Sequence, residues 1–161
     1  MSQRSDLDDV AIVGEAVLRD YPLRLWARQQ EHADEVLREF RLLLDGADSG
    51  TASFPPRQLV DLAEMFSTRF GPLIDELISV RQARLDAGAD RMDWRVPLPN
   101  STPELVRQID AVWKVVDQYC RSGDLLALAR PAAVVALQTW ATAEILTQFE
   151  GGEPTAWPGP H

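Results

Sequence analysis

The sequence predicts an all-α protein: a single-domain helical bundle of four principal helices, with one longer crossover and a Pro/Gly-rich C-terminal tail. Three observations favour this fold. Apolar residues recur at steps of three and four over four long segments. Each segment begins at or near a proline and is followed by a glycine. The chain has 161 residues, 45% of them apolar, which is enough for one buried core.

The bundle domain is expected over residues 9–150, between two irregular ends. Residues 1–8 are polar and acidic, which predicts a disordered N-terminus. Residues 151–161 carry glycine and proline and predict a tail that cannot extend a helix. Residues 10–19 are ambiguous, because their valines share a helical face while Gly14 weakens both a helix and a strand. We interpret this stretch as a short helix or an irregular arm.

The first strong helix is predicted over residues 22–45, from Pro22 to the turn at Gly46. His32 falls on its charged side, and no glutamate stands three positions before it, as a di-iron bundle site would need. We therefore interpret His32 as a solvated surface residue rather than a metal ligand. The expected inner face consists of Trp26, Gln30, Ala33, Leu37, Phe40 and Leu44.

The second helix is predicted over residues 55–86, ending before Gly88. Its apolar seam is interrupted by Gly71 and Pro72, where a kink or a break is expected. The following residues, 90–99, contain two prolines and predict an extended crossover over the bundle, with Trp94 packed against it. The seam consists of Leu59, Leu62, Phe66, Phe70, Leu73, Leu77 and Val80.

The third helix is predicted over residues 101–122, with Gly123 after its end. Its inner face consists of Leu105, Ile109, Val112, Trp113, Val116 and Tyr119. Residues 124–130 include Leu125, Leu126 and Leu128, and we interpret them as an apolar turn that covers the end of the bundle.

The fourth helix, residues 131–149, is the central one, because it is apolar on two sides and carries a single formal charge, Glu144. A helix apolar on more than one side requires protein on more than one side. Three other helices do not easily cover that surface, so the sequence also predicts a homodimer.

The net charge limits the classes of partner that the sequence predicts. A formal net charge of −9 repels phosphate backbones and anionic membranes, which argues against nucleic-acid and membrane binding. The single cysteine, Cys120, excludes an internal disulfide and is typical of a reducing cytoplasm. The N-terminal residues lack a signal-peptide pattern, so a cytoplasmic location is expected.

No motif for catalysis or cofactor binding is found. Cys120 has no base beside it and is expected to be partly buried and inert. One cysteine and two histidines do not make an ordinary closed zinc site, and phosphate loops and dinucleotide fingerprints are absent. The sequence therefore predicts no metal, no cofactor and no enzymatic activity.

Tryptophans are the candidate interaction residues: Trp94, Trp140 and Trp157. Trp94 and Trp157 lie on non-helical segments flanked by proline, where an indole either docks on its own fold or serves a partner. For Trp157 we favour docking back over the end of the bundle, because a permanently exposed indole promotes aggregation. An extended tail that fills a pocket on a partner is the alternative.

Residues 21–32 (YPLRLWARQQEH) and 35–40 (EVLREF) resemble the opening of small uncharacterised helical proteins of high-GC bacteria. Residues 140–144 (WATAE) and 151–159 (GGEPTAWPG) are similar to the close of the same proteins. Those proteins are associated with anti-sigma-factor kinases and their antagonists. The resemblance implies a regulatory protein of a partner-switching pathway and transfers no catalytic residue.

Two functions follow as hypotheses. The first is a non-enzymatic cytoplasmic regulator that acts by protein–protein interaction, with an anti-sigma-type regulator as the expected partner. The alternative is a sensor that binds a small apolar or aromatic molecule in a pocket between helices lined by tryptophans.

Overall fold

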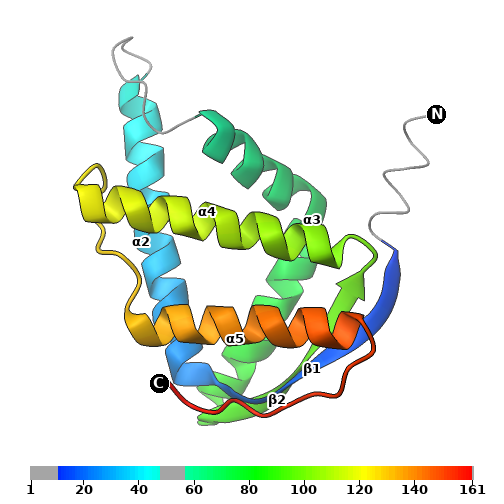
Figure 1. Ribbon diagram of the computed structural model, residues 1–161. Helices are drawn as coiled ribbons and strands as arrows, with labels where there is room; N and C mark the ends of the chain where they lie inside the picture. The colour runs from blue at the N-terminus through cyan, green and yellow to red at the C-terminus, as the bar shows by residue number, and fades with distance from the viewer. Residues whose placement is uncertain (1–10, 48–56, 161) are drawn as a thin grey trace, which may run out of the picture.

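The computed structural model describes residues 11–47 and 57–160 of the chain and contains strands as well as helices. The all-α prediction is therefore wrong, and the fold is mixed α/β (Figure 1). Residues 1–8, expected to be disordered, lie outside the described part, as do the side chains of Leu44, Leu59, Leu62 and Phe66. The elements are β1 (Ile12–Pro22), α2 (Leu23–Ala47), α3 (Arg57–Asp86), β2 (Arg91–Pro99), α4 (Thr102–Ser122) and α5 (Ala132–Phe149).

The stretch interpreted as a short helix or irregular arm is the strand β1. It pairs antiparallel with β2, with Val17 opposite Arg95 and Leu18 opposite Trp94. Ala16 and Leu18 are buried while Glu15 and Arg19 are exposed, so the burial alternates with the period of a strand. The helical spacing of its valines was misleading, because the partner that selects the strand conformation lies far along the chain.

The segment expected as an extended crossover is β2, and its extended conformation is confirmed. Trp94, Val96 and Leu98 are buried on one face of this strand. Pro97 and Pro99 are tolerated because β2 is hydrogen-bonded to a neighbour on one side only, in a sheet of two strands.

The predicted helices 22–45, 55–86, 101–122 and 131–149 correspond to α2, α3, α4 and α5. α3 is unbroken with Pro72 inside it, and its course bends in Figure 1, so the expected interruption takes the form of a bend. On α2, Trp26 and Phe40 of the expected inner face pack into the two cores, but Val36 is buried where Leu37 was expected.

α5 packs against β1, α2 and α4, as a central helix should. One of its polar side chains bonds the backbone of β1: Gln148 accepts a hydrogen bond from the Val17 amide at 2.8 Å and donates one to the Val17 carbonyl at 3.0 Å. The exposed residues of α5 are small or polar, and the homodimer stays a prediction. These exposed residues are Ala132, Thr139, Ala143 and Thr147.

The segment after α5 folds back along β1. The Trp157 amide donates to the Arg19 carbonyl at 3.0 Å, and the Trp157 side chain is 6% exposed. Glu144 accepts a hydrogen bond from the Thr155 amide at 3.0 Å, which gives the single charge of α5 a structural role. Gly152 permits the reversal, because a Cβ at this position would lie 2.8 Å from the Thr147 carbonyl oxygen.

Two buried clusters divide the interior. The sheet-end core consists of Leu18, Tyr21, Leu23, Trp26, Trp94, Val96, Leu137 and Trp157. The loop-end core consists of Val36, Val116 and Leu125, with Phe40, Trp113 and Cys120 packed around it. Within residues 11–47 and 57–160, no helix combines the length and the apolar character that a membrane span requires.

Candidate functional site

The three tryptophans predicted as interaction residues meet in the sheet-end core. Trp140 lies 5.2 Å from Trp157 and 6.4 Å from Tyr21, and Tyr21 lies 4.9 Å from Trp94, measured between ring centroids. Trp94 is 7% exposed and Trp140 is half-buried. In this structure the three tryptophans therefore pack within the fold, and Trp157 docks on its own chain, as we favoured.

Arg81 of α3 fills the centre of this aromatic cluster. Its guanidinium carbon lies 3.8 Å from the Trp94 ring centroid and 4.6 Å from that of Trp26. Its Nη1 donates to the Tyr21 hydroxyl at 3.5 Å. Burial lowers the pKa of Arg81 and raises the pKa of Tyr21. Sequence reasoning missed Arg81, although it stands four residues after Leu77 and so continues the inner row of α3.

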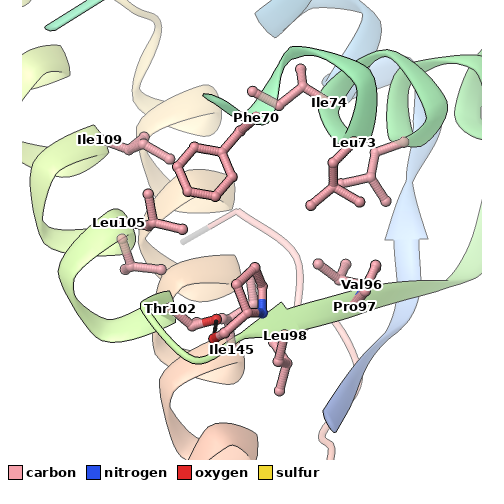
Figure 2. A pocket seen from close by; sticks show the side chains of 13 residues that line it. Phe70, Leu73, Ile74, Val96, Pro97, Leu98, Thr102, Leu105, Ile109 and Ile145 are labelled. Carbon is pink, nitrogen blue, oxygen red and sulfur yellow. Dashed lines mark hydrogen bonds between the residues drawn. The ribbon is translucent and has the colours of Figure 1, made fainter. Parts of the chain in front are cut away.

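An apolar cavity of about 140 Å³ lies elsewhere, between α3, β2, α4 and α5 (Figure 2). None of the tryptophans lines it, and Phe70 is the aromatic residue among its described lining residues. Among the described lining residues, Thr102 alone has a polar side chain, and its hydroxyl donates to the Pro99 carbonyl at 2.6 Å. The lining residues are Phe70, Leu73, Ile74, Leu77, Val96, Pro97, Leu98, Pro99, Thr102, Leu105, Val106, Ile109 and Ile145.

The segment between α4 and α5 differs from its expectation. We predicted an apolar turn that covers the end of the bundle, and only Leu125 follows that prediction, at 2% exposed. Leu126 and Leu128 point outward and are 91% and 81% exposed. Residues 125–130, which we call the leucine loop, thus bury Leu125 and Arg130 at their ends and expose Leu126 and Leu128.

Polar side chains of α2 and α4 hold the backbone of the leucine loop. The Glu39 carboxylate accepts hydrogen bonds from the amides of Leu126 and Ala127, the second at 2.9 Å. His32 Nε2 donates to the Leu128 carbonyl at 2.6 Å. His32 is therefore buried and structural, and its interpretation as a solvated residue is wrong.

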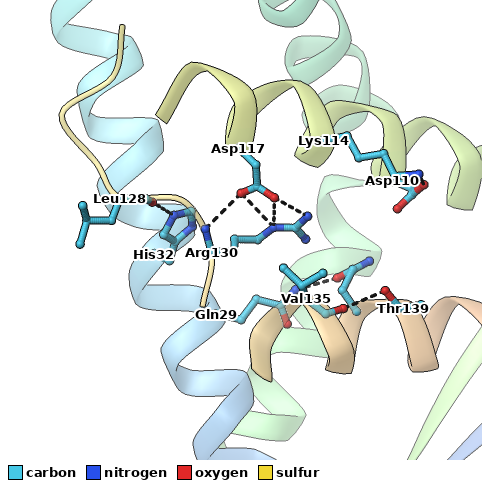
Figure 3. A network of polar contacts seen from close by, with 10 residues as sticks. Gln29, His32, Asp110, Lys114, Asp117, Leu128, Arg130, Val135 and Thr139 are labelled. Carbon is cyan, nitrogen blue, oxygen red and sulfur yellow. Dashed lines mark hydrogen bonds and ion pairs between the residues drawn. The ribbon is translucent and has the colours of Figure 1, made fainter. Parts of the chain in front are cut away.

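The end of the loop is fixed by a buried ion pair (Figure 3). Asp117 of α4 accepts hydrogen bonds from Arg130 Nε at 3.0 Å and Nη2 at 2.9 Å, and also from the Arg130 amide at 3.1 Å. The two side chains are 5% and 4% exposed. Because Asp117 also binds the Arg130 amide, the pair fixes the path of the chain into α5. Truncating one partner would leave the other charge buried and unpaired.

Cys120 does not lie in surroundings that activate a thiol. Cys120 is partly buried, as predicted, and its pKa is raised by burial and by the nearby carboxylates of Asp117 and Glu39, which disfavours a thiolate. Within residues 11–47 and 57–160, no group of three or more His, Cys, Asp or Glu side chains is placed to hold a metal ion.

The signals for this site are visible in the sequence only in part. The cluster of leucines after Gly123 is plain, but its outward direction depends on Glu39 and His32, which belong to a distant helix.

No protein-family model matches the chain, and no curated protein or solved structure is significantly similar to it.

Proposed function

We propose that this protein is a non-enzymatic regulator that acts by binding another protein through Leu126 and Leu128. The observation that carries the proposal is that exposed leucine side chains lie on a backbone fixed by hydrogen bonds. Both leucines are almost fully exposed, on a backbone that Glu39, His32 and Asp117 hold by hydrogen bonds. Exposed apolar side chains cost solubility, so a surface that orders them favours a binding role.

The energetics agree with such a role. Burying one leucine side chain contributes about 1.5–3 kcal/mol, so the pair supplies a useful core for a small interface. A segment already fixed in its free state loses little conformational entropy when it binds. The leucine loop therefore resembles a pre-formed pair of interface side chains rather than an unsupported loop.

The charge of the surroundings indicates the chemistry of the partner. The chain carries a formal net charge of −9, and the exposed carboxylates of Glu31, Glu35 and Asp124 flank the residues that hold the loop. A partner with an apolar pocket and a basic rim fits best, and its binding should weaken as salt increases. From the sequence resemblance, we propose an anti-sigma-type regulator of a partner-switching pathway.

Two matched double variants test this proposal. Leu126→Ser with Leu128→Ser removes the pair, and Ile12→Ser with Val13→Ser removes an exposed apolar pair of β1, 53% and 58% exposed. Both should fold with unfolding free energies within about 0.5 kcal/mol of wild type, because the side chains are exposed. Binding to purified anti-sigma-type kinases of high-GC bacteria, measured by biolayer interferometry, should be lost only in the first variant.

The outcomes separate the two parts of the proposal. If no kinase binds any of the three proteins, the partner-switching assignment fails. Co-purification from native lysate with the same three proteins then decides about the surface. A partner that both double variants retain equally would contradict the role of the leucine loop. Light scattering of the wild type and the loop variant reports whether the partner is a second copy of the chain.

A second candidate function is supported by the apolar cavity. Its volume of about 140 Å³ is below the roughly 300–1,000 Å³ of drug-sized sites, so it suits a short aliphatic or single-ring molecule. Melting in the presence of 1-hexanol tests this candidate. An increase in melting temperature that is lost in Ile109→Trp, which fills the cavity, supports it, and an equal increase in both proteins contradicts it.

A further inference from the structure

A second cavity, of about 210 Å³, lies between α4 and α5 behind the leucine loop. It is lined chiefly by polar side chains, in contrast to the apolar cavity described above. α4 contributes Asp110, Lys114, Asp117 and Arg121, and α5 contributes Gln138. Arg130, whose guanidinium lies between the two helices in Figure 3, forms its inner wall.

Arg130 and Gln138 keep hydrogen-bond donors that have no acceptor among the described residues. Arg130 binds Asp117 through Nε and Nη2, whereas Arg130 Nη1 is buried and has no partner in the described part of the chain. Gln138 Oε1 accepts a hydrogen bond from Gln29 Nε2 at 2.7 Å, which directs the Gln138 amide NH₂ to other acceptors. A buried guanidinium donor without an acceptor is unusual and calls for an explanation.

The two carboxylates of the cavity are each paired with a cation. Both oxygens of Asp117 receive hydrogen bonds from Arg130, and Asp110 forms an ion pair with Lys114 at 2.7 Å. Three cationic side chains face two carboxylates, so the cavity has a formal charge of +1 in a chain of −9. The local charge and the free donors therefore favour the same ligand, an anion.

We propose that this cavity binds a small oxyanion, the phosphate or carboxylate group of a metabolite. Arg130 Nη1 and Gln138 Nε2 donate to its oxygens, and Arg121 attracts it at the rim. The volume is sufficient for such a group together with water. This site requires neither Leu126 nor Leu128, although Arg130, at the end of the leucine loop, contributes to it.

Titration with simple anions tests the site. Sodium phosphate and sodium acetate, each balanced with chloride at constant ionic strength, are added to the full-length protein, and side-chain NMR signals are followed. We expect saturable shifts of the Arg130 and Gln138 side-chain signals with at least one of the two anions. The stronger anion identifies the source of the oxyanion as a phosphate or a carboxylate.

Variants locate the binding. Gln138→Leu and Arg121→Gln should each weaken the affinity by on the order of tenfold, because each removes a donor or a charge. Arg107→Gln, on the exposed side of the same helix α4, should leave it unchanged. Arg130→Lys, which keeps a charge beside Asp117 but lacks Nη1, should abolish the shifts if it folds. The other two variants decide if it does not.

The proposal is overturned if neither anion produces saturable shifts at these side chains. It is also overturned if Gln138→Leu and Arg121→Gln bind as tightly as wild type, since the anion then occupies another place.

Discussion

At the sheet end of the molecule, tryptophans from distant segments turn inward around Arg81, whereas at the loop end two leucines turn outward on a backbone held by polar side chains. The tryptophans, which were predicted as interaction residues, thus pack in the core at the sheet end. At the other end, buried polar groups are used to present ordinary apolar residues. Residue type alone therefore did not indicate which of these side chains the fold buries.

The difference lies in what each end leaves exposed. In the sheet-end core, Trp94 and Trp157 are nearly covered, and the guanidinium of Arg81 takes the place that a ligand cation would have in an aromatic site. In the loop-end core, Leu125 is buried, but its neighbours Leu126 and Leu128 have no cover within the described chain. The following predictions test this contrast, from the largest effect to the smallest.

Trp94→Ala should destabilise the protein most, by about 3–5 kcal/mol, because it opens a cavity and removes the ring nearest to Arg81. Urea unfolding followed by circular dichroism measures the loss. Trp94→Phe retains a ring and should cost distinctly less. Equal losses in the two variants would show that the contact with Arg81 does not matter.

Asp117→Asn should cost about 3 kcal/mol, because the Arg130 guanidinium remains buried without its carboxylate. The double variant Asp117→Leu with Arg130→Met should recover most of that stability, since a packed apolar pair of similar volume replaces the ion pair. Chemical denaturation of the three proteins gives the comparison. A double variant as unstable as the single one would mean that the network, rather than the unpaired charge, dominates.

Truncation after Gly152 should reduce the free energy of unfolding by about 2 kcal/mol, because it removes the buried Trp157 side chain. The helical signal should remain, since α5 ends at Phe149. Truncation after Trp157 is the control and should melt near wild type. A chain cut after Gly152 that melts like wild type but loses its partner would instead assign a docking role to the tail.

Glu39→Ala should cost about 1 kcal/mol, because two loop amides lose their acceptor. The larger effect should be local: amide hydrogen exchange of Leu126 and Ala127 should accelerate, and other regions should be unchanged. Glu35→Ala, an exposed carboxylate on the same helix, is the control. If these two amides exchange as fast in wild type as in the variant, Glu39 does not hold the loop.

Local information in the sequence is sufficient for the helices. The apolar spacing and the flanking residues Pro22, Gly88, Gly123 and Pro131 place α2 to α5 close to their observed limits. It is not sufficient for β1, whose valines also fit a helix and whose strand partner is β2. Nor could it place the tryptophans together, since their meeting depends on how the tail, β2 and α5 assemble.

The same limit applies to the candidate surface. A run of leucines predicts apolar character, and burial of the whole turn was the simplest interpretation. The outward direction of Leu126 and Leu128 is set by hydrogen bonds between the loop backbone and the side chains of Glu39 and His32. Both residues lie far from the loop in the sequence. His32 was placed on the surface for a related reason, because the acceptor that its ring contacts is a backbone carbonyl that no side-chain pattern reveals.

Backbone ¹⁵N relaxation of residues 124–130 tests the central claim most directly. The account predicts a rigid leucine loop, with order parameters of about 0.85 at Leu126 and Leu128, similar to those of the flanking helices. Order parameters below about 0.6 at these residues, with rigid helices on either side, would contradict it. The two leucines would then belong to a mobile connection, and their exposure would give no support to a binding surface.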